Sequence, residues 1–276
     1  MNKLNLDYQA VIEDYQSGLS TIKLAKKYNC CSSTIRNLLI KNGCTRRNNR
    51  YYRTKWNFDH DFFGVINTER KAYWLGFMYA DGNIRMHGNQ PIIQFRLYDK
   101  EMIEKFIDDI NGNMPIKWYT SSGCKMPYYG VYLTSQKMFD DLCHLGCVPN
   151  KSLILKFPSM KQVPMKFMNH FIRGYFDGDG SVHILNKKFI KNPVSNPIIA
   201  IKHKLEVSFS GTKEFLYYLS YFLGFVSIKK ENRRASNTYY CNTINNETVK
   251  WIYKFMYQDA SVYLKRKKDV FDNYFK

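Results

Sequence analysis

The nonapeptide WLGFMYADG at residues 74–82 occurs a second time as IRGYFDGDG at residues 172–180, and this pair decides the fold. Both copies end in an acidic residue followed by glycine, which aligns Asp81 with Asp179. A motif that occurs twice in one chain predicts a duplicated structural unit. The two copies of that unit would be related by a pseudo-twofold axis.

Each copy has a glycine in the middle of an otherwise helical stretch, Gly76 in the first and Gly174 in the second. Glycine in a helix interior costs about 1 kcal/mol relative to alanine, so its use at the same place twice needs a reason. Ala80 and Gly178 follow four residues later and lie on the same face of each helix. Small residues at this spacing predict two helices whose backbones pack closely together.

Gly82 and Gly180 follow the acids and predict the helix ends, because glycine in the left-handed conformation terminates many helices. Asp81 and Asp179 would then lie at the C-terminal ends of two touching helices. There the helix dipoles and the two like charges disfavour ionised carboxylates. A hard divalent cation, Mg²⁺ above all, would offset this repulsion. The pair therefore predicts a magnesium site.

The residues after each nonapeptide repeat one order of secondary structure. Alternating apolar residues predict a half-buried strand in each copy, and an amphipathic helix, a second strand pair and a closing helix follow. The strand residues are Ile93, Phe95 and Leu97 in the first copy and Leu205, Val207 and Phe209 in the second. The helices are expected at 100–110, 136–145, 213–223 and 248–257. This order predicts an α+β fold, a duplicated αββαββα domain with halves at 61–160 and 161–276.

Residues 1–46 precede this repeat and have a purely helical pattern of apolar residues. Three short helices are predicted, with Ser20 capping the second and Ser32 or Ser33 capping the third. Asn29 stands at the turn between them, where the left-handed conformation is expected. The pattern resembles the helix-turn-helix of site-specific recombinases. The alternative is a structural three-helix bundle.

A helix-turn-helix places its second helix in the major groove, where exposed side chains contact bases and phosphates. Here the DNA-contacting residues would be Ser32, Ser33, Arg36, Asn37 and Lys41. Residues 47–60 form an expected linker that is rich in basic and aromatic side chains. The arginines expected to lie along DNA, at the end of the helical domain and in the linker, are Arg46, Arg47, Arg50 and Arg53.

The whole chain of 276 residues has a formal net charge of +19, with 42 Lys plus Arg against 23 Asp plus Glu. Such a surplus repels itself unless an anionic partner neutralises it, and double-stranded DNA is the partner expected. Codon bias is the alternative, but that bias should raise Glu as readily as Lys. A composition that is 45% apolar and 16% aromatic excludes a disordered chain.

Membrane insertion and secretion fit the sequence poorly. The longest uncharged run, residues 215–228, is shorter than the roughly 20 apolar residues that a spanning helix needs. The N-terminus carries acidic residues where a signal peptide would be apolar. Seven cysteines, an odd number, indicate a reducing compartment. A cytoplasm or another DNA-containing compartment is expected, in a bacterial or phage-infected cell or in an organelle.

The two nonapeptides resemble the signature of the LAGLIDADG homing endonucleases, and the resemblance covers nearly all of residues 58–276. It implies that Asp81 and Asp179, the acids before the final glycines, are the catalytic metal ligands. Mg²⁺ is the cofactor implied, with other divalent cations such as Mn²⁺ able to substitute. Asp177 matches an earlier acid of the family pattern that is not the principal ligand, and Tyr79 stands at that place in the first copy.

The resemblance also implies basic residues near the scissile phosphates. The closing segment YLKRKK resembles the family's C-terminal signature, which gives Lys267, and less directly Lys265, a charge-stabilising role. Lys151 takes this role in the first half. A glutamine often found beside the metal is absent, because Asp99 and Gly211 fall near that place. Equal cleavage rates on the two DNA strands are therefore not expected.

Outward side chains of the two sheets read DNA in this family. Ile84 and Val182 are apolar and expected to face the core, which turns their neighbours in each strand outward. The DNA-facing residues would be Asn83, Arg85, Gln94 and Arg96 in the first sheet and Ser181, His183, Glu206 and Ser208 in the second. An ordinary solvated strand face is the alternative for each of them. Residues 186–204 predict a long hairpin loop or insertion that meets the DNA backbone.

The resemblance implies a monomeric, site-specific endonuclease that makes a double-strand break with short 3′ overhangs. His170 and His183 flank the second motif, but the family uses carboxylates and metal, which disfavours a catalytic histidine. Two alternatives remain, an RNA maturase that assists intron splicing and a transcription regulator that binds DNA without cleaving it. A regulator would be expected to lose the acids, and both are present. The start at Met1 and the lack of a C-terminal His-Asn favour a free-standing or intron-encoded protein.

Overall fold

The computed structural model describes residues 7–16, 19–44, 56–120, 127–191, 198–231 and 238–276. The chain forms two compact units, residues 1–49 and residues 50–276. None of the helices in these described ranges is long and apolar enough to cross a membrane.

The first unit contains three helices, α1 (Tyr8–Gln16), α2 (Thr21–Lys27) and α3 (Ser32–Lys41). Their apolar faces form one small core. The Ser20 hydroxyl accepts a hydrogen bond from the backbone N–H of Lys23 and caps α2. Asn29, with φ of 47°, makes the left-handed turn between α2 and α3. These three helices and both turn features agree with the sequence prediction.

The expected serine cap of α3 is wrong. Cys31 occupies the N-cap position, and Ser32 and Ser33 already belong to the first helical turn. The Cys31 Sγ lies 2.9 Å from both the Ser33 Oγ and the Thr34 Oγ1. Because the helix starts at Ser32, the two serine hydroxyls are not placed to cap it.

The second unit contains the predicted duplication. The first half consists of α4 (Glu69–Ala80), β1 (Asn83–His87), β2 (Gln90–Leu97), α5 (Lys100–Asp109), β3 (Lys117–Tyr119), β4 (Tyr128–Leu133) and α6 (Gln136–His144). The second half consists of α7 (Met168–Asp179), β5 (Ser181–Lys191), β6 (Ile198–Gly211), α8 (Lys213–Leu223), β7 (Lys229–Lys230), β8 (Tyr239–Thr243) and α9 (Asn246–Tyr257). Each half has an antiparallel four-stranded sheet, ordered β1-β2-β4-β3 and β5-β6-β8-β7. The two identical strand orders confirm the αββαββα repeat.

Two short 3-10 helices, Lys151–Leu153 and Met165–Phe167, lie between α6 and α7, and a further helix, α10 (Lys265–Phe275), follows α9. Trp56 to His60, expected in the linker, pack on the second unit. The Phe58 side chain is buried in its core, and the Asp59 N–H donates to the carbonyl of Ile110. Within the described part of the chain, the second unit therefore begins at residue 56.

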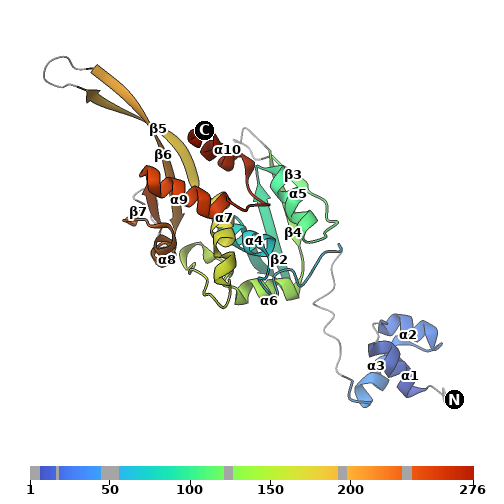
Figure 1. The fold of residues 1–276 in the computed structure, drawn as a ribbon. Helices are drawn as coiled ribbons and strands as arrows, with labels where there is room; N and C mark the ends of the chain where they lie inside the picture. Colours follow the sequence, from blue (N-terminus) through green and yellow to red (C-terminus); the bar gives the residue numbers. More distant parts are fainter. Residues whose placement is uncertain (1–6, 17–18, 45–55, 121–126, 192–197, 232–237) are drawn as a thin grey trace. The chain divides into compact units, whose positions relative to one another are not determined.

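Helices α4 and α7 lie side by side at the centre of the second unit (Figure 1). A Cβ atom on Gly76 would overlap the carbonyl oxygen of Phe171, and one on Gly174 would overlap that of Tyr73. Further along, a Cβ atom on Gly178 would overlap the Ala80 side chain. The small residues are therefore required by the close backbone approach, as the sequence predicted.

Gly82 and Gly180 end these helices, but not in the left-handed conformation that we expected. Gly180 is extended, with φ of −78° and ψ of 162°, and Gly82 is not among the residues with positive φ. The chain turns directly from each helix into a strand. A Cβ atom on Gly82 would lie 2.6 Å from the Met78 carbonyl oxygen, so close approach, and not helix reversal, requires glycine here.

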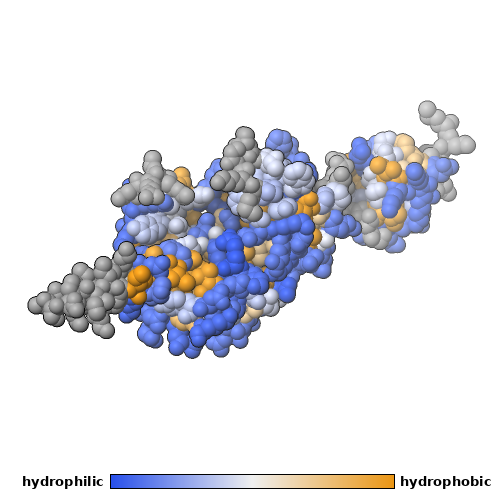
Figure 2. All heavy atoms as spheres, turned by 90° about the horizontal axis from the view of Figure 1, so that it is seen from above, coloured by the Kyte–Doolittle hydropathy of each residue, from blue (hydrophilic) through white to orange (hydrophobic). Residues whose placement is uncertain are grey.

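The segment 186–204, expected as a long hairpin loop or insertion in the second sheet, is a hairpin whose described residues are strand. Strands β5 and β6 pair in register from Ser181↔Ser208 to Lys191↔Ile198, and they project as a long hairpin from the second sheet (Figure 1). Its polar sequence lacks the apolar alternation that marks a half-buried strand. Figure 2 shows apolar side chains gathered beside this hairpin, whose described part exposes Ile184 and Ile201.

Candidate active site

Asp81 caps the C-terminal end of α4, and Asp179 is the last residue of α7. Both residues are exposed to solvent. The two helix ends meet, because a Cβ atom placed on Gly178 of α7 would lie 3.3 Å from the Asp81 Oδ2. The packing of α4 on α7 thus brings the two acids of the repeat into one site.

The electrostatics of Asp81 reflect this position. Protein atoms surround most of its carboxyl group although the residue has solvent access. This desolvation, together with the negative charge of Asp179, raises the pKa of Asp81 to about 6. The positive charges of Lys267 and Lys151 act in the opposite direction. The site therefore carries unfavourable negative charge that a cation would stabilise.

A buried lysine lies at the end of each central helix. The Lys151 Nζ donates to the carbonyl oxygens of Ala80 and Gly82. The Lys267 Nζ donates to the carbonyl oxygens of Phe176, Gly178 and Gly180, at 2.7, 3.2 and 2.5 Å. These carbonyls belong to the last helical turns and the residues after them, where helical partners run out. Burial lowers the pKa of Lys267 to about 8.

The four residues Asp81, Asp179, Lys151 and Lys267 thus form a pseudo-symmetric cluster, one acid and one lysine from each half. A positive charge is favourable at a helix C-terminus, which explains why burial of the two lysines is tolerated. Lys265 has a different place. It is exposed and pairs with Asp269 one turn along α10.

Arg266, between Lys265 and Lys267, was not singled out from the sequence. Its guanidinium pairs with the Asp99 carboxylate at 3.1–3.2 Å, which joins the second half to the first. Its charge also lowers the pKa of Asp81 slightly. In a run of four basic residues, no local signal separates the one that binds across the molecule from its neighbours.

The donor set at the helix ends suits a hard divalent cation. In the described ranges, no group of three His, Cys, Asp or Glu residues could hold a metal ion. Asp81 and Asp179 could supply two carboxylates, and water or a ligand's oxygens would complete the coordination. Mg²⁺ commonly binds in this way, through one or two carboxylates with several waters retained.

The exposed face of the first sheet is polar, basic and aromatic. Asn83 and Arg85 alternate with the buried Ile84 along β1, and Arg96 lies on the same face of β2. The Arg96 guanidinium donates to the Tyr132 hydroxyl. Gln94 shares this face but is only 3% exposed, because the Arg85 guanidinium covers it and donates to its Oε1 at 3.1 Å. Gln94 therefore supports Arg85, and its expected direct contact with DNA is not available.

The second sheet has an equivalent face. Ser181 and Ser208 are cross-strand partners whose hydroxyls lie 2.9 Å apart. His183 and Glu206 are the next pair on this face, with Nε2 and Oε2 2.9 Å apart. Val182 between them packs partly against the core. The strand parity expected from the sequence thus holds in both sheets.

Residues 172–272 match the family model of the LAGLIDADG endonucleases. The second half of the duplicated unit is therefore similar to the LAGLIDADG endonucleases. The family match spans most of the second half of the duplicated unit, and the first half repeats its topology.

Solved meganuclease structures have a similar fold. I-SmaMI bound to uncleavable DNA is 14% identical, with a TM-score of 0.50 over 73% of this chain and 86% of that one. I-AabMI bound to uncleaved DNA is 12% identical, with a TM-score of 0.49 over 72% of this chain and 87% of that one. No curated protein sequence matches the chain.

The earlier acid of the second motif is a structural group. Asp177 is 1% exposed and accepts hydrogen bonds from the hydroxyls of Tyr73 and Tyr257 and from the Leu264 N–H. In the first motif, the Tyr79 hydroxyl instead donates to the Leu145 carbonyl. Both side chains tie a central helix to the end of its own half, which explains why an acid is needed in only one copy.

The two histidines that flank the second motif are not at the acids. His170 accepts a hydrogen bond from Arg173, and burial lowers its pKa. His183 lies on the exposed sheet face. That neither histidine is catalytic stays a prediction.

In the first unit, α3 presents polar side chains to solvent. Ser33, Arg36, Asn37 and Lys41 are exposed, and Ser32 is partly exposed. The expected DNA contacts Arg46, Arg47, Arg50 and Arg53 lie outside the described residues.

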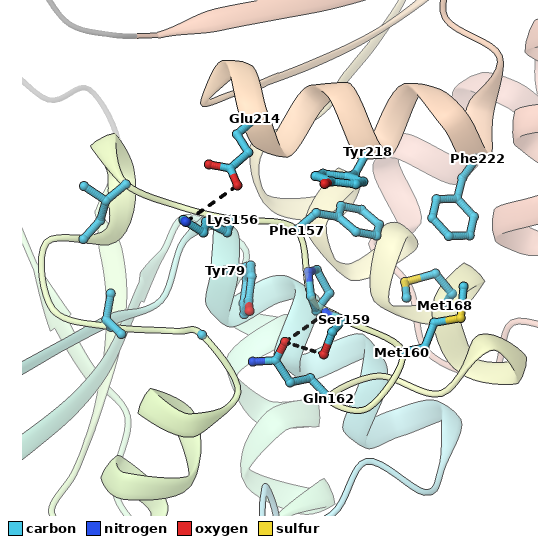
Figure 3. A pocket seen from close by; sticks show the side chains of 14 residues that line it. Tyr79, Lys156, Phe157, Ser159, Met160, Gln162, Met168, Glu214, Tyr218 and Phe222 are labelled. Carbon is cyan, nitrogen blue, oxygen red and sulfur yellow. Dashed lines mark hydrogen bonds and ion pairs between the residues drawn. The ribbon is translucent and has the colours of Figure 1, made fainter.

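A separate hollow of about 640 Å³ lies beside Tyr79, between residues 146–162 and α8. Its walls are mostly apolar, with the Lys156–Glu214 ion pair and Ser159 bound to Gln162 as polar groups (Figure 3). Neither Asp81 nor Asp179 lines it. The hollow is therefore distinct from the candidate active site.

Proposed function

We propose that this protein is a site-specific, Mg²⁺-dependent DNA endonuclease that acts as a monomer and cuts both strands of a long target. The observation that carries the proposal is the pseudo-symmetric cluster at the ends of α4 and α7. Each half provides one solvent-accessible acid, Asp81 or Asp179, and one buried lysine, Lys151 or Lys267. Two equivalent half-sites suit a substrate with two scissile phosphates.

Asp81 and Asp179 would hold the metal, with the repulsion between them relieved by its charge. Bound Mg²⁺ would lower the pKa of a coordinated water and stabilise charge on the phosphate. Lys151 and Lys267 fix the helix ends through the carbonyls that they bind, and they add positive charge beside each acid. That charge would favour the developing negative charge of the transition state.

The exposed faces of the two sheets are the proposed DNA-binding surface. Arg85, Arg96 and Lys204 bring positive charge to these faces, while Asn83, Ser181, His183 and Ser208 offer hydrogen-bonding groups for base edges. The net charge of +19 favours binding to a polyanion. The similar fold of I-SmaMI, which was solved on uncleavable DNA, supports the proposal that this protein binds DNA.

Metal removal tests the proposed chemistry. A library of DNA targets incubated with the protein and Mg²⁺ should yield one family of ends with short 3′ overhangs, identified by sequencing. Addition of a chelator should reduce cleavage below detection, and excess Mg²⁺ or Mn²⁺ should restore it, because the bound metal would both activate the attacking water and stabilise charge on the phosphate. Binding without cleavage at any tested cation would instead favour a regulator. Binding of a structured intron RNA without DNA cleavage would favour a maturase.

A second prediction concerns the first unit. Removal of residues 1–55 should weaken binding to the target by a few kcal/mol, because it removes α3 and the basic linker and with them several phosphate contacts. The cleavage rate at saturating protein should stay within about threefold, since the catalytic acids lie in the other unit. Footprinting should show protection lost at one end of the target. An unchanged footprint would mean that the first unit does not bind DNA.

The deletion ends at residue 55 because Phe58 belongs to the core of the second unit. As a control, Arg36→Ala and Lys41→Ala in the full chain should shorten the same end of the footprint while leaving the fold intact.

A further inference from the structure

The two lysines of the active site are held in different ways. Lys267 lies in the first turn of α10, three residues after the N-cap residue Leu264. The segment before this helix, residues 256–264, is fixed by buried charged groups. Lys151 has no such support in the described first half. This difference divides the pseudo-symmetric site into two unequal parts.

Arg173 on α7 is the centre of the buried charged groups. It is 0% exposed, and its guanidinium donates to the carbonyl oxygens of Met256 and Val262 at 2.7 and 2.9 Å. It also donates to the Glu69 Oε1 at 2.7 Å. A buried guanidinium requires such partners, because a charge in the interior is unfavourable without them.

Glu69 reaches this segment from the first half. It lies in the first turn of α4, and its carboxylate accepts hydrogen bonds from the Ser261 N–H at 2.7 Å and the Ser261 hydroxyl at 2.9 Å. One side chain of the first half therefore holds both Arg173 and the backbone that leads to Lys267.

Asp177, two residues before Asp179, completes the support. It accepts a hydrogen bond from the Leu264 N–H at 2.7 Å, and Leu264 is the N-cap residue of α10. The backbone is thus fixed at both Ser261 and Leu264. Lys267 lies three residues after Leu264, and its Nζ contacts the carbonyl oxygens at the end of α7.

The first half has apolar or aromatic residues at the equivalent places. In the first half, Leu75 stands at the place of Arg173 and Tyr79 at the place of Asp177. Glu69 belongs to the first half, and its equivalent in the second half is Phe167. The segment before Lys151 is tied by the Tyr79 hydroxyl to the Leu145 carbonyl and by the Cys147 Sγ to the Met78 carbonyl at 3.6 Å. Among the described residues, charged groups therefore fix the segment before Lys267 and not the one before Lys151.

We propose that Glu69 is a positioning residue for Lys267, and through it for the cleavage of one of the two DNA strands. This inference rests on the proposed endonuclease function. Glu69 lies at the start of α4, whereas the acids lie at the ends of α4 and α7, so it acts through Arg173 and the 256–264 segment. A misplacement of a catalytic group by about 1 Å costs on the order of a hundredfold in rate, so a small shift of this segment has a measurable effect.

The test measures the nicking rate of each strand separately, on a target labelled differently on its two strands. Glu69→Gln should slow one strand by roughly tenfold or more and leave the other within about twofold. The unaffected strand is an internal control for folding, concentration and DNA binding. Glu104→Gln removes an exposed glutamate of the helical ion pair with Lys100 and should change neither rate.

Comparison with the lysines identifies the route of the effect. Lys267→Met should slow the same strand as Glu69→Gln, and Lys151→Met should slow the opposite strand. In the double variant of Glu69 and Lys267, the affected strand should be no slower than in Lys267→Met alone, since coupled residues are not additive. Ser261→Ala removes one Glu69 contact and should give a weaker bias in the same direction, which decides the matter if Glu69→Gln does not fold.

Equal slowing of both strands by Glu69→Gln, or slowing of the strand that depends on Lys151, would overturn the inference. So would two unchanged rates. A wild-type protein that cuts neither strand of its bound target would instead contradict the proposed endonuclease function, so the two failures are distinguishable.

Discussion

Replacement of Asp81 or Asp179 by asparagine is expected to abolish double-strand cleavage while specific DNA binding stays within about tenfold. Each substitution keeps the shape of the side chain and removes one negative charge from the helix junction. Two carboxylates are the only protein ligands proposed for the metal, so the loss of either leaves a site that cannot hold it in place. Neither acid lies on the sheet faces proposed to bind DNA.

Cleavage and binding should be measured on the same target, with gel-shift titration in a chelator for binding. A melting experiment separates lost chemistry from lost folding. The pKa of Asp81 is raised to about 6 in the folded protein, so its ionised form opposes folding, and stability is lost as pH rises through this value. Asp81→Asn should therefore melt at or above the wild-type temperature at pH 7 without metal. Wild-type cleavage of both strands by either variant would contradict the assignment of these acids.

The central part of the fold was predictable because its determinants are local. The repeated glycines and acids specify two helices that must touch, and the alternating residues after them specify strands with one buried face. Ile84 illustrates this: a single apolar residue between Asn83 and Arg85 fixes which side of the sheet is exposed. The lysines required the family resemblance, because the periodicity of the sequence does not distinguish Lys267 from Lys265.

The remaining features depend on contacts between distant residues. Glu69 and Ser261 are hydrogen-bonded although they are 192 residues apart in the sequence. No residue near Glu69 in the sequence indicates that its partner is a buried arginine. Gln94 has the strand parity of an exposed residue but is covered by Arg85. The need for glycine at position 180 comes from the Phe176 ring and carbonyl, which a Cβ atom there would overlap. Local sequence patterns indicate which way a side chain faces and whether it is buried, whereas these features follow from three-dimensional packing.

Replacement of Gly76 or Gly174 by leucine is expected to reduce folding stability and cleavage together. The closest approach at these positions is to backbone, since a Cβ atom on Gly174 would overlap the Tyr73 carbonyl oxygen. A flexible side chain could move aside, but a helix backbone cannot move without its neighbours. Overpacking costs about 1 to 3 kcal/mol where side chains can adjust, and we expect a value at or above the upper end.

Cleavage should fall further than the loss of folded protein explains. Asp81 and Asp179 are carried by the two helices that the leucine would separate, and displacement of a catalytic group by about 1 Å costs on the order of a hundredfold in rate. Thermal melting and cleavage should be measured on one preparation, below the melting transition. Lys250→Leu, at an exposed position of α9, is the control for added apolar volume and should change neither quantity. If both glycine variants keep the wild-type melting temperature and cleavage rate, Asp81 and Asp179 are not positioned by a shared helix interface.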